Sequence, residues 1–304
     1  MTSPLERAVA QDLAAEVPVE VTAAAAALAA ELGGVAVLFY GSVLRTRALD
    51  DILDFYVLTA GARGGVVRRA ALRWLWPDVS YHEIVVGGRT LRAKVATMPL
   101  GTFERAVGGG MLDTTLWARF TQPSALVWTA TSEHRQRVTR AVADAAITAG
   151  RFAAALGPTV GTAESYWRAL LRETYKAELR VEKPGREGQI LAHAPARYDT
   201  LLPLAWASGG IGFERQGAVL TPALSASDRR ATLSAWRNRA RAGKPLNVAR
   251  LVKAAFTFEG AARYGLWKIE RHTGVRIALT PWRERHPILA APGVLWRVLR
   301  PQPR

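Results

Sequence analysis

The 304-residue sequence contains no cysteine. This absence excludes disulfide bonds, thiolate metal sites, cysteine nucleophiles and iron–sulfur clusters. No run of about 18 uninterrupted apolar residues occurs, so the sequence predicts no membrane-spanning helix. The first residues include Glu6, Asp12, Glu16 and Glu20, an acidic content that fits neither a secretory signal nor a transit peptide. We therefore expect a chain that is soluble or bound at a membrane surface.

Acidic residues are scarce in the last quarter of the chain. Residues Arg229 to Arg304 hold 17 of the 41 lysines and arginines but only 3 of the 25 acids. Nearly all of the formal charge of +16 therefore lies in this quarter, and such a segment predicts a polyanionic partner. Nucleic acid and anionic lipid headgroups are the two candidates, and charge alone does not separate them.

The first 130 residues predict helices alternating with short strands. Hydrophobic residues make up 49% of the chain and charged residues 22%, which is typical of a globular protein with a sizeable core. Gly33 and Gly34 end an alanine-rich helix, and Gly87 and Gly88 form a hairpin turn. We expect helices at residues 21–32, 66–76 and 112–120, and strands at 35–40, 54–58, 81–86, 90–97 and 124–128. This order indicates an α+β sheet domain.

The rest of the chain predicts mainly helices. We expect helices at residues 133–156 and 163–181 and further helical segments to about Trp236. Apolar residues recur at helical spacing from Leu251 to Ile269 and predict one amphipathic helix ending by Gly274. The tail, residues 286–304, mixes apolar residues with arginines and suits a membrane interface. The predicted domains are residues 1–130, a mainly helical part at 131–245, and a basic amphipathic region at 246–304.

Residues 38–58, LFYGSVLRTRALDDILDFYVL, are the most informative stretch. An apolar strand leads into the turn Gly41-Ser42, and Asp54 opens the next apolar strand. Nucleotidyltransferases of the polymerase-β type use this arrangement: glycine lets backbone amides approach a triphosphate, serine can bond a phosphate oxygen, and the carboxylate holds Mg²⁺. A plain turn and a strand-capping aspartate explain the segment equally well. The usual second carboxylate would fall at Tyr56, although Asp50 and Asp51 lie nearby.

The chain resembles the mitochondrial-type phosphatidate cytidylyltransferase family, which includes the translocator assembly and maintenance proteins and their bacterial relatives. That family also has a single aspartate before an apolar strand. The similar segments are FYGS at 39–42, LDF at 53–55, GRTLRAKV at 88–95, WARFTQP at 117–123, KAAFT at 253–257 and RYGLWK at 263–268. Departures from the family's pattern are Ala118 before the arginine and Thr121-Gln122 after it.

The resemblance implies a fold, a reaction and a location. The fold is a polymerase-β-type nucleotidyltransferase domain, a mainly helical, winged-helix-like second domain and an amphipathic C-terminal segment. The reaction transfers CMP from CTP to phosphatidic acid, with Mg²⁺, giving CDP-diacylglycerol and pyrophosphate. The implied location is peripheral, on the cytoplasmic face of a bacterial inner membrane. We expect CTP, phosphatidic acid and an anionic membrane surface as partners, and no nucleic acid.

The resemblance also implies roles for individual residues. Gly41 and Ser42 match the phosphate-binding turn, and Asp54 matches the metal-binding acid. Lys94 and Arg119 would offset the charge of the triphosphate, although each is also explained as a solvated surface cation. The expected catalytic residues are Asp54, Ser42 and Lys94, the nucleotide-binding residues Gly41, Ser42, Lys94 and Arg119, and the metal ligands Asp54 and Asp51. For Tyr175, Glu178 and Arg180 we expect a structural role near the cleft.

Two other functions stay open. The first is a nucleotidyltransferase with a different acceptor, such as RNA or a small hydroxyl compound, which explains the basic quarter equally well but not its interspersed apolar residues. The second is an inactive membrane-bound or nucleic-acid-binding adaptor of the same fold, for which Tyr56 in place of a second carboxylate is the best support.

Overall fold

The structure is a computed structural model that describes residues 2–62, 75–178 and 185–286, with residues 289, 290, 293, 294 and 296 of the tail. The expected helix at 66–76 falls almost entirely outside these residues, as does Arg180. Most of the apolar tail residues that the sequence singled out also fall outside. The described residues form an α+β protein, as the sequence predicts.

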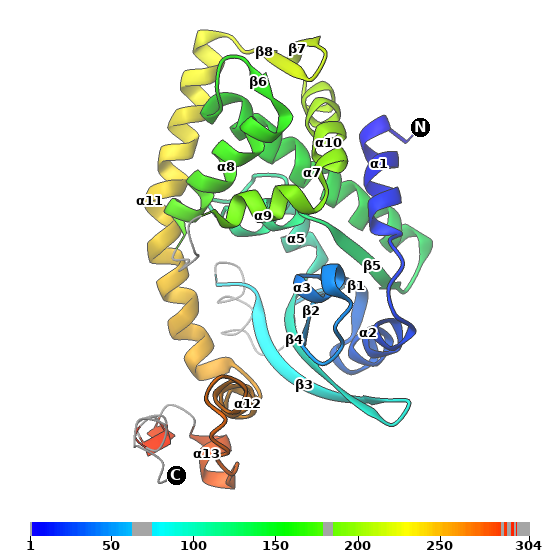
Figure 1. Cartoon of the computed structure of the whole chain (residues 1–304), viewed down its shortest axis with the longest axis vertical. Helices are drawn as coiled ribbons and strands as arrows, with labels where there is room; N and C mark the ends of the chain where they lie inside the picture. The colour runs from blue at the N-terminus through cyan, green and yellow to red at the C-terminus, as the bar shows by residue number, and fades with distance from the viewer. Residues whose placement is uncertain are drawn as a thin grey trace.

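A mixed five-stranded sheet occupies the first half of the chain (Figure 1). Its strand order is β3-β4-β2-β1-β5, in which β2 and β4 are parallel and all other neighbours antiparallel. All five strands were expected. The strands are β1 (Gly34–Tyr40), β2 (Ile52–Thr59), β3 (Asp78–Val86), β4 (Arg89–Pro99) and β5 (Ser124–Thr129). One expectation was wrong: β2 begins at Ile52, which pairs with Arg92, so Asp54 lies inside the strand.

Helices cover both faces of this sheet. Helix α2 (Val19–Leu32) ends at Gly33 as expected and packs on one face, where Phe39 and Phe55 are buried. Helix α1 (Pro4–Leu13) and helices α5 (Leu100–Val107), α6 (Thr115–Phe120) and α7 (Ser132–Leu156) form the cluster of buried residues on the other face. Helix α5 was not expected, and α6 starts later than predicted because the Asp113 carboxylate accepts a hydrogen bond from the Leu116 N–H at 3.3 Å.

A smaller three-stranded sheet, of order β6-β8-β7, follows α7. The elements here are β6 (Gly161–Thr162), α8 (Ala163–Ala177), α9 (Arg186–His193), α10 (Pro195–Ser208), β7 (Gly212–Gln216) and β8 (Val219–Ala223). The sequence pattern predicts helical segments up to about Trp236 and does not indicate the hairpin of β7 and β8. Gly210 and Gly217, both with positive φ, end α10 and turn the hairpin.

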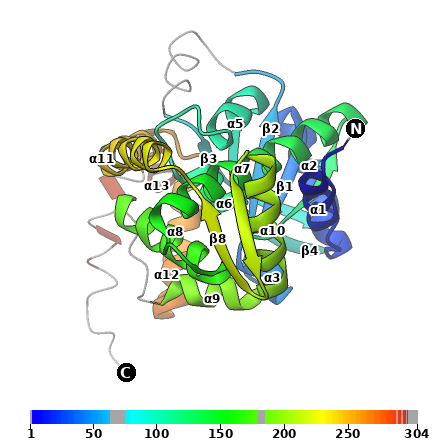
Figure 2. The same cartoon turned by 90° about the horizontal axis from the view of Figure 1, so that it is seen from above.

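A long helix, α11 (Ala226–Thr257), runs along one side of the molecule from the hairpin of β7 and β8 to the edge of the five-stranded sheet (Figures 1 and 2). Helices α12 (Ala261–Thr273) and α13 (Pro281–Arg285) follow it. The single helix expected from Leu251 to Ile269 is therefore two helices. The break arises because the Glu259 carbonyl accepts a hydrogen bond from the Tyr81 N–H of β3 at 2.9 Å, and Gly260 then turns the chain with φ +79°.

The largest cluster of buried side chains is continuous across residue 130, where the sequence predicts a domain boundary. Trp117 of α6 stacks on Phe152 of α7, with ring centroids 5.5 Å apart, and meets the edge of Trp236 of α11 at 6.4 Å. The same cluster extends from Leu5 to Trp236. The division at residue 130 stays a prediction, and we expect the two sides to unfold together.

Replacing Trp117 tests this shared core. Because Trp117 is fully buried and touches both α7 and α11, Trp117→Ala should lower the free energy of unfolding by about 3–5 kcal/mol. The loss should appear as a single shifted transition in calorimetry and in circular dichroism. Trp282→Ala, at a tryptophan that is 54% exposed, is the control and should cost under about 0.5 kcal/mol. Two separate transitions, only one of them shifted, would contradict the shared core.

Candidate functional site

Four side chains lie in one row across the five-stranded sheet. Tyr40 of β1 pairs with Asp54 of β2, and Asp54 pairs with Lys94 of β4. Lys94 in turn pairs with Tyr81 of β3. Residues directly opposite one another on neighbouring strands project from the same face. The row lies on the face that carries buried Tyr56 and Leu58 further along β2, where the apolar core gives way to polar residues.

The turn after β1 brings backbone against the Asp54 carboxylate. Gly41 has φ +95° and ψ −160°, and a Cβ atom built there would lie 2.7 Å from Asp54 Oδ2. Both the conformation and the contact require glycine at this position. Ser42 follows as the first residue of the short helix α3 (Ser42–Thr46) and is half-buried. The expected Gly-Ser turn and Asp54 therefore lie together.

Arg119 enters the site from the end of α6. Its guanidinium carbon lies 4.8 Å from the centre of the Tyr40 ring, and its buried Nε has no hydrogen-bond acceptor within the described residues. Burial alone would lower the Arg119 pKa, but Tyr40, Tyr56, Asp54 and Glu178 outweigh it and raise the pKa. Arg119 is thus a fixed positive charge beside the row.

Asp54 and Lys94 are partly buried side chains that influence each other's pKa. Burial raises the Asp54 pKa above its ordinary value, although Lys94 and Arg119 oppose this effect. Burial lowers the Lys94 pKa, and the positive charges of Arg119 and Lys268 lower it further against the opposing effect of Asp54. Both charged forms are therefore poorly solvated. A bound polyanion or cation would replace the missing water.

Of Tyr175, Glu178 and Arg180, which the sequence placed near the cleft, Glu178 lies close to this site. Glu178 follows α8 and is buried, and its carboxylate accepts a hydrogen bond from Thr114 Oγ1 at 2.7 Å. Its negative charge raises the Arg119 pKa. Tyr175 packs, partly buried, against the large core cluster. Arg180 lies outside the described residues. Glu178 thus links α8 to the segment that leads into α6.

The residues of α12 that reach this site lie in the segment 263–268, to which the sequence assigned a family resemblance but no site role. Burial raises the Tyr264 pKa, and so does the negative charge of Asp54, which places Tyr264 within electrostatic range of the row. Its ring centroid lies 5.9 Å from that of Tyr81. The positive charge of Lys268, one turn further along α12, lowers the Lys94 pKa. The spacing of Tyr264, Trp267 and Lys268 on one helical face was the available signal.

Asp51, the second expected metal ligand, is engaged through one oxygen, and its role as a ligand stays a prediction. Its carboxylate accepts hydrogen bonds from Arg271 Nη1 of α12 and from the Ile52 N–H, each at 2.9 Å. Its negative charge reaches Asp54 and raises the Asp54 pKa. Among the residues that the structure describes, no group of three or more histidine, aspartate or glutamate side chains is placed to hold a metal ion. Mg²⁺ at this site fits Asp54 as the protein ligand, because Mg²⁺ commonly takes one or two carboxylates with phosphate and water oxygens.

Comparison with models of known protein families gives no match. A search among curated protein sequences gives none either. The resemblance to the phosphatidate cytidylyltransferase family therefore rests on the short segments quoted above. The geometry of the site gives a second indication of function. The partly buried Asp54 carboxylate lies beside the Gly41 turn and near the positive charges of Lys94 and Arg119. This set of groups suits a metal-bound polyphosphate.

The close contact at Gly41 gives a test of the turn. Gly41→Ala should lower the free energy of unfolding by about 1–3 kcal/mol for its strained backbone, and more for the clash with Asp54. Gly87→Ala is the matched control, since Gly87 also has positive φ but open space around its Cβ position. Urea unfolding of both variants measures the difference, and equal losses would contradict the contact.

The raised Asp54 pKa gives a second test. A carboxyl whose pKa is higher in the folded state disfavours folding once it ionises, so its cost is absent below its unfolded pKa and full above its folded pKa. Asp54→Asn should therefore stabilise the protein at pH 7, and the gain should shrink as the pH falls toward 4. Urea unfolding across this pH range measures the gain. A variant less stable than wild type at pH 7 would contradict this pKa direction.

Proposed function

We propose that the protein is a nucleotidyltransferase that transfers CMP from CTP to phosphatidic acid and releases pyrophosphate. The observation that carries the proposal is the contact of the Gly41 backbone with the Asp54 carboxylate, in a row that also holds Lys94. This is the juxtaposition that the segment from Leu38 to Leu58 predicts for nucleotidyl transfer. The choice of CTP and phosphatidic acid comes from the family resemblance.

The proposed reaction needs little acid–base chemistry from the protein. An oxygen of the phosphatidate phosphate forms a bond to the α-phosphorus of CTP, and the bond from that phosphorus to the bridging oxygen of pyrophosphate breaks. The attacking phosphate is already ionised near neutral pH, so no strong general base is required. Lys94 and Arg119 would balance the triphosphate charge, and the Gly41 turn would position it. Mg²⁺ held by Asp54 would neutralise further negative charge.

The arrangement of elements supports the proposed domains. We assign the five-stranded sheet to a polymerase-β-type nucleotidyltransferase domain. The order of α7, β6, helices α8 to α10 and strands β7 and β8, with sheet order β6-β8-β7, is similar to that of a winged helix, with one additional helix between β6 and β7. We assign residues 131–245 to such a domain and residues 246–304 to a membrane-associating region.

Exposed side chains support a lipid acceptor over a nucleic acid. On the second half of α11, Val248, Leu251 and Val252 are each about half exposed, and Trp282 of α13 is exposed as well. These apolar side chains lie in the basic quarter of the chain, a combination that suits an anionic membrane surface. No helix within the described ranges is long and apolar enough to cross a bilayer. We propose peripheral attachment at the cytoplasmic face of the inner membrane.

Helix α10 also argues against binding DNA in the usual winged-helix manner. In that mode, the helix before the hairpin would enter the major groove. Here Leu202 and Trp206 lie on the buried face of α10, and its exposed face carries no positive charge. The residues on that exposed face include Ala196, Asp199 and Thr200. Arg197 Nε donates a hydrogen bond to Asp12 at 2.6 Å, and its Nη1 donates to the Thr121 carbonyl at 2.5 Å. The helix and this arginine are thus engaged within the protein.

A transfer assay tests the proposal. CTP labelled in its α-phosphate is incubated with Mg²⁺ and liposomes containing phosphatidic acid, and label in the lipid fraction is measured. Asp54→Asn should lower the rate by about 100-fold or more, because the proposed metal ligand is lost. Asp50→Asn, at an exposed aspartate paired with Arg89, is the matched control and should leave the rate unchanged.

Parallel reactions separate the alternatives. ATP, GTP and UTP should give less lipid label than CTP, and equal transfer from all four would contradict the choice of CTP. Label transferred to RNA or to a small hydroxyl compound, with none in lipid, would show that the acceptor is wrong. Absence of transfer with every nucleotide and acceptor would favour the inactive adaptor.

A further inference from the structure

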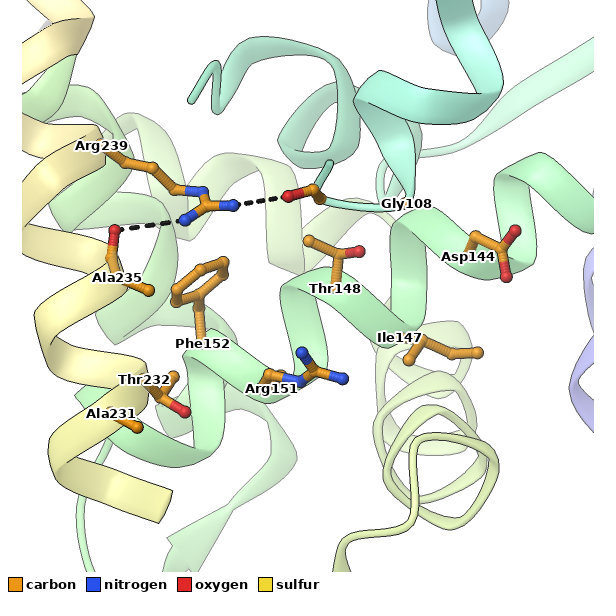
Figure 3. Close-up of a pocket in the computed structure, with 11 residues that line it drawn as sticks. Gly108, Asp144, Ile147, Thr148, Arg151, Phe152, Ala231, Thr232, Ala235 and Arg239 are labelled. Carbon is orange, nitrogen blue, oxygen red and sulfur yellow. Dashed lines mark hydrogen bonds between the residues drawn. The ribbon is translucent and has the colours of Figure 1, made fainter. Parts of the chain in front are cut away.

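A cavity of about 490 Å³ lies between α7, α11 and the loop after α5, and shares no lining residue with the candidate site. Its volume falls in the range of small-molecule sites, about 300–1,000 Å³. One arginine from each helix lines it, Arg151 on α7 and Arg239 on α11 (Figure 3). Two segments distant in sequence thus bring positive charge to one cavity.

Arg239 is held firmly, but its charge is not neutralised. Its Nη2 donates a hydrogen bond to the Gly109 carbonyl at 2.6 Å, and its Nη1 donates to the Ala235 carbonyl at 3.2 Å. The guanidinium also lies over the Phe152 ring, 5.0 Å from its centre. Both acceptors are uncharged backbone groups. Burial lowers the Arg239 pKa, and the nearby charge of Arg151 lowers it further.

The two arginines form an uncompensated pair of positive charges. Within the described ranges, neither Arg151 nor Arg239 forms an ion pair with an acidic side chain. A partly buried charge beside a like charge is unfavourable until an anion approaches. Guanidinium groups bind phosphate through paired hydrogen bonds, and two of them match the double charge of a phosphate monoester.

The other walls of the cavity suit a hydroxylated ligand. Thr148 of α7 and Thr232 of α11 also line the cavity, and each has a hydroxyl group. Asp144 lies at the end of the cavity opposite Arg239, next to Ile147 (Figure 3). A carboxylate there accepts hydrogen bonds from hydroxyl groups while keeping away from the anionic end of a ligand.

We propose that this cavity binds a phosphate monoester of a hydroxylated compound. The phosphate lies between Arg151 and Arg239, and the hydroxyl groups of the ligand face Asp144. The proposal is independent of the proposed transferase function, because it rests on different residues.

Isothermal titration calorimetry of the full chain with ribose 5-phosphate, without Mg²⁺, tests the site. We expect saturable binding that Arg151→Gln weakens about tenfold, as the loss of one charge-assisted contact of about 1.4 kcal/mol predicts. Arg135→Gln on α7 and Arg237→Gln on α11 are matched controls at exposed positions and should leave the affinity unchanged. Inorganic phosphate should bind more weakly, and ribose should not bind.

A second set of variants separates this cavity from the candidate active site. Lys94→Gln should leave the binding of ribose 5-phosphate unchanged, and loss of binding in that variant would place the ligand beside Asp54 instead. Arg239→Gln should also weaken binding, with urea unfolding as a check on its fold. Arg151 is exposed, so Arg151→Gln keeps the test valid if Arg239→Gln unfolds. No saturable binding up to about 10 mM, or equal weakening by Arg135→Gln, would overturn the proposal.

Discussion

The pairing of β2 with β4 fixes the positions of Asp54 and Lys94, the two charged residues that the sheet contributes to the candidate site. Because these strands are parallel and in register, Asp54 and Lys94 lie side by side on one face of the sheet. A shift of one residue in either strand would move its side chain to the opposite face, which α2 covers. The acid–base pair is thus a consequence of sheet register, and the same register places Leu53 and Phe55 in the core beneath α2.

Helices from the second half of the chain complete what the sheet begins. Glu178, after α8, raises the Arg119 pKa, and Lys268 of α12 lowers the Lys94 pKa. Tyr264 of α12 lies close enough to Asp54 for the Asp54 charge to raise the Tyr264 pKa. Helix α12 is held over the sheet by the bond between Tyr81 and Glu259 and by the ion pair of Arg271 with Asp51. The candidate site is therefore built from both ends of the sequence, and a sheet domain taken alone would lack part of it.

Local sequence patterns predicted the parts of the fold that depend on local signals. The strands around Phe39 and Phe55 are continuous apolar runs, and Gly33 ends α2 by adopting a left-handed conformation. Patterns failed where a distant contact decides the outcome. The periodicity from Leu251 to Ile269 predicts one helix, but pairing of Glu259 with β3 breaks it. Similarly, residue spacing predicted that Gly41 and Asp54 lie together. No local signal indicated that Arg271 of α12 would form an ion pair with Asp51.

The basic quarter of the chain shows how a charge count can mislead. Its sequence predicts a surface for a polyanion, yet several of its cations are engaged inside the protein. Arg250 forms a largely buried ion pair with Asp113 and lies over the Trp76 ring, and Lys253 pairs with Asp78 at 2.5 Å. These contacts fasten α11 to Trp76 and the start of β3, and to the loop before α6. The charge available to a membrane is consequently smaller than the sequence suggests, and apolar side chains such as Leu251 and Trp282 must carry a larger share of any attachment.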